Sequence, residues 1–328
     1  MPDTIQYCIT VDTEEEWDWA SGYPTGPCRL ANIAQLSQFH DICEQHGAAV
    51  VYFTNHAVLA NADSRAAIQN LALRPHTEIG LHIHPWNTPP LSAAAAVPAR
   101  ESFLHNLPWP VQQAKLDSTL AAFREANLHP TSFRGGRYST SPQIQDHLRR
   151  HGVWVDCSVL PGTTWADDGA PDYRHRNLAP VRRAPDEVHA KPVWELPLTF
   201  GNTSTDQRRG AKLLQAADSA LGRALRLTGL MDRLGIVSRC WLNFENPLGE
   251  RMLRFLEVLR VQRPPFVSFT LHSSSLLPGG SPYNRTAADV ERMLTRLRGT
   301  LRRLQDWPEF TPATMTAIAT TLEEVRPR

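Results

Sequence analysis

Short hydrophobic stretches alternate with stretches of helical spacing along most of the chain, and this alternation limits the folds available to it. Segments rich in β-branched and aromatic residues predict buried strands, and they fall at 5–11, 48–54, 78–84, 131–134, 153–158, 193–198, 238–244 and 266–271. Helical periodicity predicts helices between them, at about 30–46, 57–73, 111–126, 141–151, 207–234 and 249–260, with a long amphipathic helix after Thr286. Strands that alternate with helices predict a parallel sheet, so we expect one α/β barrel-like domain with an elaborated second half.

The composition places few other limits on the protein. A chain of 328 residues that is 41% hydrophobic and 20% charged is ordinary for a globular protein. Its formal net charge of +1 gives no overall electrostatic reason to expect nucleic acid or an anionic membrane as a partner.

The cysteines and the first residues bear on the cellular compartment. The five cysteines are scattered and form no CxxC pair, which argues against a disulfide framework and a structural zinc knuckle. The first residues lead into a strand pattern without a signal-peptide pattern, and no hydrophobic run is long enough to span a bilayer. These features predict a cytoplasmic protein without a transmembrane segment.

The stretch Glu78-Ile79-Gly80-Leu81-His82-Ile83-His84-Pro85-Trp86 carries the clearest chemical signal. Alternate side chains of a strand share a face, so His82 and His84 point the same way. Two imidazoles at the end of a strand are suitable metal ligands that lack only a carboxylate. A pair of hydrogen-bonded or solvent-facing histidines remains the alternative.

Other strand ends carry polar residues as well. The first strand leads into Asp12 and Glu14, which share a face if the extended geometry persists. A short strand at 131–134 ends in Arg134-Gly135-Gly136-Arg137-Tyr138, where two glycines permit a tight turn, and the strand 266–271 ends at His272. Parallel α/β folds place their sites at this edge, although an acidic loop in solvent would also explain the carboxylates.

Together these residues suit metal-assisted hydrolysis. Two histidines and a carboxylate leave positions open, as in catalytic metal sites. Asp12 could take a proton from water, His272 could protonate a leaving group, and backbone N–H groups of the glycine turn could face an oxyanion.

In their order along the chain these motifs resemble the polysaccharide deacetylases, the NodB-homology proteins of carbohydrate esterase family 4, and most of all their WalW-like branch. The resemblance rests on the segments 10–14, 78–82, 133–138, 156–158 and 271–272, and it covers about residues 5–280 as a catalytic core, with a helical region at about 285–328. It implies a distorted (β/α) barrel in a single domain over 1–328. It also implies metal-dependent removal of acetyl groups from N-acetylated or O-acetylated sugars, a carbon–nitrogen hydrolase activity on an acetylated carbohydrate.

The same resemblance assigns roles to residues. Asp12 would be the base, Arg134 the residue that orients it and His272 the acid, while Glu14, His82 and His84 would bind a divalent metal, with zinc as the first candidate. Trp86, Gly136 and Tyr138 are expected to contact the substrate. Independently of the resemblance, Trp17, Trp19 and Trp86 could stack on sugar faces, and packing in the core or at the rim is the alternative.

The chain departs from the family pattern in two places. The family's metal-binding aspartate directly follows the base, whereas here Thr13 intervenes and Glu14 is the candidate. Its second histidine stands four residues after the first, a position that Trp86 holds here, so His84 would have to substitute.

Other classes remain open at this stage. They are an amidohydrolase acting on a small amide, a non-haem iron oxygenase, and a carbohydrate-binding or scaffold domain without metal. Strand–helix alternation argues against the all-β oxygenase barrel, and amidohydrolase barrels normally carry His-x-His on the first strand.

Overall fold

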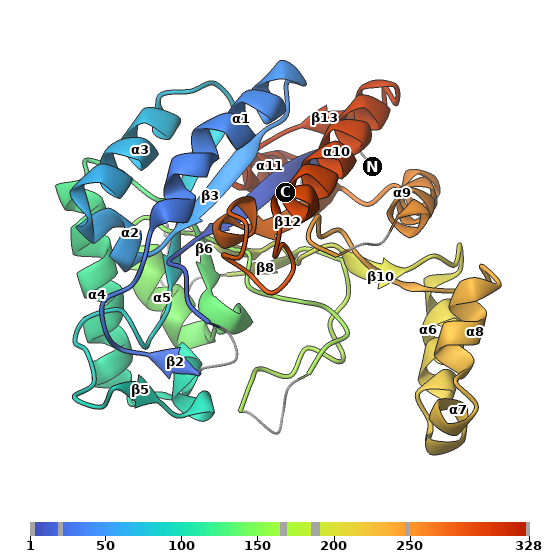
Figure 1. Cartoon of the computed structure of the whole chain (residues 1–328), viewed down its shortest axis with the longest axis horizontal. Coiled ribbons are helices and arrows are strands. Elements are labelled where there is room, and N and C mark those ends of the chain that lie inside the picture. Colours follow the sequence, from blue (N-terminus) through green and yellow to red (C-terminus); the bar gives the residue numbers. More distant parts are fainter. Residues whose placement is uncertain (1–3, 19–21, 165–168, 185–190, 247–248, 326–328) are drawn as a thin grey trace.

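The computed structural model of the protein describes residues 4–18, 22–164, 169–184, 191–246 and 249–325. A curled nine-stranded sheet forms its centre (Figure 1), with β1 (Ile5–Thr13) between β12 (Phe266–His272) and β3 (Val50–Thr54). The path continues from β3 through four further parallel strands, which are β4 (Thr77–Ile83), β6 (Ser132–Gly135), β7 (Val155–Asp156) and β9 (Val193–Glu195). The predicted parallel α/β architecture is thus confirmed.

Two strands complete the sheet. The sequence did not predict the first, and it indicated only a weak strand or helix in the region of the second. The edge strand β8 (Val181–Arg183) lies in a region without sequence periodicity and runs antiparallel to β9. The strand β13 (Phe310–Pro312) follows what the sequence indicated as the last strand and pairs with the beginning of β1. The C-terminal helical region is therefore joined to β1 in the sheet.

Irregular segments continue the curl where regular pairing stops. Backbone hydrogen bonds link Leu198 to Val159, Leu242 to Thr199, and Phe244 to Thr270 of β12. The predicted strand at 238–244 is short, because only β11 (Arg239–Trp241) is regular and it pairs with β10 (Phe200–Asn202) outside the main sheet. This gives the barrel its distorted shape.

Helices surround the strands in Figure 1, and most begin where the sequence predicted. They are α1 (Leu36–Gln45), α4 (Trp109–Glu125), α5 (Pro142–Arg150), α9 (Glu250–Gln262), α10 (Ala287–Gln305) and α11 (Met315–Glu324). The side chains of Ser141 and Thr286 accept hydrogen bonds from backbone N–H groups of the first turns of α5 and α10, which fixes where these helices begin.

Two predicted helices are divided. Asn61 separates α2 (His56–Ala60) from α3 (Ala62–Ala72) and caps the second. The stretch 207–234 forms α6 (Gln207–Ala217), α7 (Ala220–Ala224) and α8 (Leu227–Arg233), because Ser219 caps α7 and Arg226 has a left-handed φ of 52°. A polar cap inside a periodic stretch ends one helix and starts another.

The main core lies between sheet and helices, and it contains buried apolar side chains of β1, β3 and β4. The segment after Trp86 contains β5 (Ala96–Val97), which pairs with β2 (Tyr23–Pro24), and two short 3-10 helices. No helix in the described ranges is both long and apolar enough to cross a membrane.

Candidate active site and metal centre

Strand register brings the predicted residues to one edge of the sheet. Asp12 of β1 pairs with His272 of β12, and His82 of β4 pairs with Arg134 of β6. Because all four strands are parallel, their C-terminal ends meet at the same edge. Glu14 and His84 directly follow β1 and β4.

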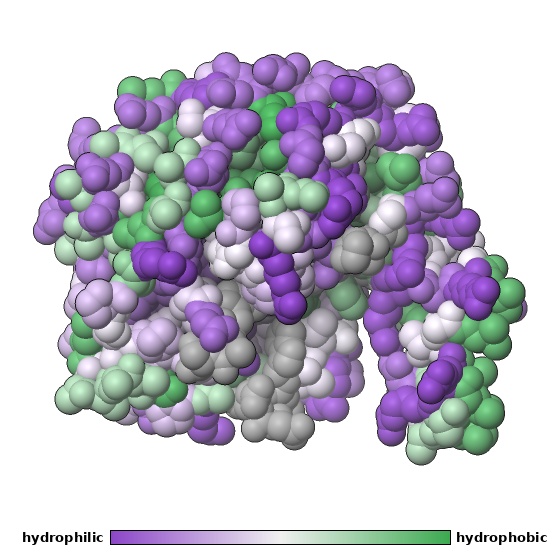
Figure 2. All heavy atoms as spheres, viewed as in Figure 1, coloured by the Kyte–Doolittle hydropathy of each residue, from purple (hydrophilic) through white to green (hydrophobic). Residues whose placement is uncertain are grey.

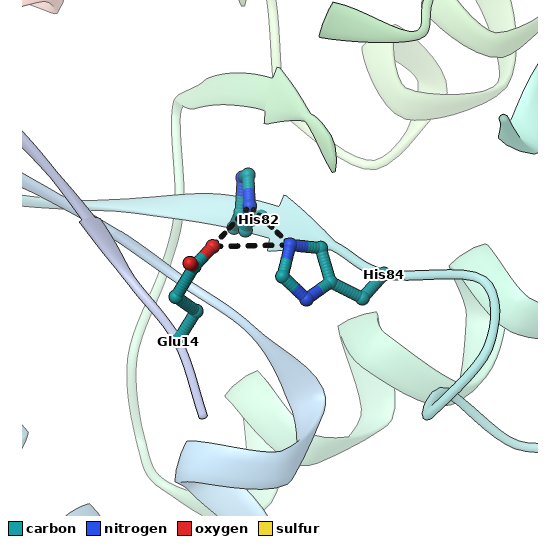
Figure 3. Close-up of side chains that lie close together, drawn as sticks. All are labelled: Glu14, His82 and His84. Atoms are coloured by element: carbon teal, nitrogen blue, oxygen red, sulfur yellow. Dashed lines mark hydrogen bonds and ion pairs between the residues drawn. The ribbon is translucent and has the colours of Figure 1, made fainter. Parts of the chain in front are cut away.

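Glu14, His82 and His84 converge as three potential ligands (Figure 3). The two imidazole Nε2 atoms lie 3.1 Å apart, and Glu14 Oε2 lies 3.5 Å from His82 Nε2 and 3.1 Å from His84 Nε2. All three side chains are buried, at 2% exposure each. The period-two argument for the two histidines therefore describes their geometry correctly.

The Nδ1 atoms of His82 and His84 each lie within hydrogen-bond distance of an oxygen atom. His82 Nδ1 lies 2.7 Å from the backbone oxygen of Arg134, and His84 Nδ1 lies 2.9 Å from Glu15 Oε1. A carbonyl oxygen only accepts, so His82 carries its proton on Nδ1 and turns the Nε2 lone pair toward Glu14 when neutral. Such outer hydrogen bonds orient metal-binding histidines.

A cation fits this group of atoms. A neutral His82 and the Glu14 carboxylate bring lone pairs together, and Glu14 Oε1 is buried with no hydrogen-bond partner among the described residues. Without a metal, burial favours neutral His84, but Glu15 and Glu14 outweigh burial and raise its pKa to about 10. A proton on His84 thus relieves the carboxylates in part, and a divalent cation bound by Nε2 and oxygen atoms would replace it.

Asp12 lies beside these ligands and is held by a buried arginine. Arg134 Nη1 donates to Asp12 Oδ1 over 2.6 Å, and its Nη2 donates to Thr10 Oγ1 over 3.0 Å. The guanidinium is fully buried and lies 4.3 Å from the ring centroid of Phe53. Arg134 therefore holds the Asp12 carboxylate in place, and its role in orienting a base stays a prediction.

His272 is held by a carboxylate that the sequence analysis did not identify. Its Nδ1 lies 2.9 Å from Glu245 Oε2, and its Nε2 lies 3.8 Å from Asp12 Oδ2. Burial favours neutral His272, but Glu245 and Glu14 outweigh it and raise the pKa to about 10. The neighbouring carboxylates thus favour the imidazolium form of His272, the form that a general acid requires.

These groups open onto a cavity of about 310 Å³. Asp12, Glu14, His82, His84 and His272 form its polar part, and its walls are Trp17, Tyr23, Phe103, Arg137, Tyr138, Trp241 and Tyr283. Tyr138 lies where it was predicted, whereas Trp19 falls outside the described residues. The aromatic walls can pack against a small, partly apolar ligand.

Trp86 and Gly136, which were expected to contact the substrate, pack against His84 instead. Trp86 is only 1% exposed and stacks on His84, with ring centroids 4.1 Å apart, so its face is not available to a sugar. Gly136 packs behind the same imidazole, where a Cβ would lie 2.5 Å from His84 Cδ2. Both residues pack against His84 and are absent from the cavity lining among the described residues.

The glycine turn also differs from its prediction. Left-handed φ angles occur at Arg137 and Tyr138, at 51° and 61°, and at neither glycine. The Gly135 N–H donates to Ser158 Oγ over 2.9 Å, so it does not serve as an oxyanion donor here. The turn needs glycine for close approach, since a Cβ at Gly135 would lie 1.8 Å from the Ser139 oxygen.

Glu15 and Glu245 are the functional residues that the sequence analysis missed. Glu245 directly follows the predicted strand 238–244, so the rule that identified Asp12 at a strand end could have found it. Glu15 was not separable from its acidic neighbours, because period two places it opposite Glu14, whereas its carboxylate reaches back to His84.

No family model matches the chain, and no curated protein matches its sequence. Solved structures do resemble it. A protein assigned as a polysaccharide deacetylase from Mycobacterium smegmatis is 15% identical, with a TM-score of 0.51 over 99% of this chain and 93% of that chain. A second such protein, from Pseudomonas aeruginosa PAO1, is 13% identical with a TM-score of 0.51 over the same shares.

PuuE allantoinase is similar to the same extent, at 12% identity and a TM-score of 0.53 over 99% of this chain and 93% of that chain. Likenesses at such low identity concern the path of the backbone rather than the chemistry. The fold expected from the strand-end motifs is confirmed: this chain has the fold of the polysaccharide deacetylases.

Proposed function

We propose that the protein is a metal-dependent hydrolase that removes acetyl groups from an N-acetylated or O-acetylated sugar or polysaccharide precursor. The observation that carries this proposal is the convergence of Glu14, His82 and His84 beside Asp12 and His272 in one cavity. Glu14, His82 and His84 would hold the cation, for which zinc is the first candidate because its protein sites use nitrogen and carboxylate oxygen ligands.

A divalent ion in such a site lowers the pKa of bound water toward ~7 and polarises a carbonyl. Asp12 would accept a proton from the attacking water, with Arg134 keeping its carboxylate toward the cavity. His272 would donate its Nε2 proton to the departing nitrogen or oxygen as the bond to the acetyl carbon breaks, while Glu245 holds Nδ1. Acetate and the free amine or hydroxyl are the products.

The volume and the lining of the cavity limit the size and kind of substrate that it can hold. Its volume of about 310 Å³ lies at the low end for ligand sites, so it holds one sugar unit with its acetyl group more readily than a long chain. Trp17 and Trp241 line its walls and offer apolar surface to a sugar ring. An acetylated carbohydrate is the proposed partner, and the cytoplasmic location inferred from the sequence remains an expectation.

A second candidate is hydrolysis of a small amide. The likeness to an allantoinase and the small cavity both favour it. The same proton transfers by Asp12 and His272 would serve either reaction, so substrate assays must decide between them.

Acetate release from a panel of N-acetylated and O-acetylated sugars tests the proposal, with small cyclic amides as the rival substrates. The protein is assayed after chelation and after addition of Zn²⁺ or another divalent metal. His82→Ala should lose bound metal and activity, whereas His129→Ala, a change at an exposed histidine, should retain both. Metal-independent acetate release, or full metal content in His82→Ala, would refute the ligand assignment.

A further inference from the structure

A protruding helical unit is the largest feature that the proposed chemistry does not use. We call residues 207–236, which contain α6, α7 and α8, the helical finger. It extends from the strands β10 and β11 and stands apart from the barrel body in Figure 1. Its inner contacts are tight, since a Cβ at Gly222 would lie 2.4 Å from the Ala217 oxygen.

The helical finger exposes an unusual amount of apolar side chain. Twelve large hydrophobic residues are exposed in the described parts of the chain, and six of them lie on the helical finger. They are Leu213 (40% exposed), Leu221 (70%), Leu225 (58%), Leu230 (50%), Leu234 (63%) and Ile236 (54%). Figure 2 shows green, hydrophobic surface beside purple, hydrophilic surface over α7 and α8.

The helix α8 shows why this surface lacks a partner within the chain. Leu227, Leu230, Met231 and Leu234 follow the i, i+3, i+4, i+7 spacing of an apolar stripe. Such a stripe normally faces a core, yet α8 contains no buried residue. Leu227 and Met231 are half-buried, but Leu230 and Leu234 are exposed and available to something outside the described residues.

The charge of the helical finger indicates which kind of partner could bind this surface. It contains six basic and two acidic residues, a net charge of +4 within a chain of net charge +1. All six basic residues are exposed. The two acids, Asp218 and Asp232, form ion pairs with Arg239 and Arg251, which lie outside the helical finger.

We propose that the helical finger docks on an anionic lipid bilayer, with its leucines at the acyl boundary and its basic residues among the headgroups. Interfacial helices combine an apolar face with Lys and Arg in this way. Face-to-face contact with a second copy would set one +4 unit against another, which disfavours that occupant. The nearly neutral whole chain conceals this local charge.

The proposal goes beyond the deacetylase function and does not depend on it. Trp241, which lines the cavity, belongs to β11, the strand that follows the helical finger. Docking would therefore hold the cavity close to a membrane surface.

Co-flotation of the full chain with vesicles tests the proposal, with phosphatidylcholine alone compared with a phosphatidylcholine–phosphatidylglycerol mixture. We expect binding to the anionic mixture that weakens as salt is added. Arg209→Gln/Lys212→Gln should weaken binding about 25-fold, since each basic residue contributes about fivefold near the surface. The control Arg302→Gln/Arg303→Gln, on α10, should bind as the unaltered protein does.

Leu230→Ser should weaken binding about tenfold through lost apolar burial. The control Leu73→Ser alters a residue that is 86% exposed on another part of the surface, and it should have no effect. Circular dichroism of each variant checks the fold. Absence of vesicle binding, equal binding by finger and control variants, or a dimer in light scattering that Leu230→Ser makes monomeric would each overturn the proposal.

Discussion

Replacing Gly136 with alanine tests whether the glycine turn acts on the metal ligands rather than on the substrate. The added Cβ would lie 2.5 Å from His84 Cδ2 and 2.5 Å from the Ile83 oxygen. Carbon atoms in contact prefer about 3.5–4.0 Å, so the imidazole has to retreat by about 1 Å. The Ile83 oxygen belongs to the backbone and cannot turn aside, so part of the strain must remain in the turn.

We expect the unfolding free energy of Gly136→Ala to fall by about 1–3 kcal/mol, the usual cost of overpacking. Metal affinity should fall by about 10–100-fold, as it does when the support of a ligand is disturbed. Chelator competition measures the affinity, and chemical denaturation measures the stability. Gly26→Ala is the matched control, because its added Cβ has no atom within 4 Å.

Gly136 could either position His84 or leave room for substrate, and the quantity that changes in Gly136→Ala distinguishes these two roles. If the glycine served only to admit substrate, Gly136→Ala would raise KM while metal affinity and stability stayed equal to those of Gly26→Ala. That outcome would refute the positioning role. Loss of metal affinity with an intact fold would support it.

Five further predictions concern the proton-transfer groups and the support of His84. Asp12→Asn should keep bound metal but lose activity by roughly 10²–10⁴-fold, whereas loss of metal would make Asp12 a ligand. His272→Ala should slow amide hydrolysis far more than hydrolysis of an activated aryl acetate, and equal losses would indicate a structural role. Because the carboxylates around His272 raise its pKa, activity that needs its proton should persist at neutral pH and decline only at alkaline pH. Glu245→Gln removes the main charge that raises this pKa, so the decline should move to lower pH, and an unchanged pH–rate profile would contradict this assignment. Glu15→Gln should lower metal affinity about 10–100-fold, because it weakens the support of His84 Nδ1, and isothermal titration would measure the change.

Local patterns in the sequence predicted residues whose positions follow from the periodicity of a strand and from the shared edge of parallel strands. His82 and His84 share a face because alternate residues of any strand do so. Asp12, Arg134 and His272 meet because parallel strands end at one edge, which follows from strand–helix alternation. The caps at Ser141 and Thr286 are local for the same reason.

Contacts between distant segments were not predictable in this way. Glu245 reaches His272 from 27 positions away, and Glu15 reaches His84 from 69 positions away. Their partners depend on how the sheet curls and on which rotamers the packing allows. The same reason explains Trp86, whose aromatic character suggested a sugar contact but whose ring is enclosed against His84.

The sequence by itself determined the parallel α/β class, the edge at which the chemistry gathers and the identity of the three ligand candidates. These follow from side-chain periodicity, which is a property of each segment alone. Tertiary structure decided the tautomer of His82, the orientation of Asp12, the burial of Trp86 and the exposure of the helical finger. Each of these depends on atoms brought together from separate segments, and periodicity contains no information about which segments meet.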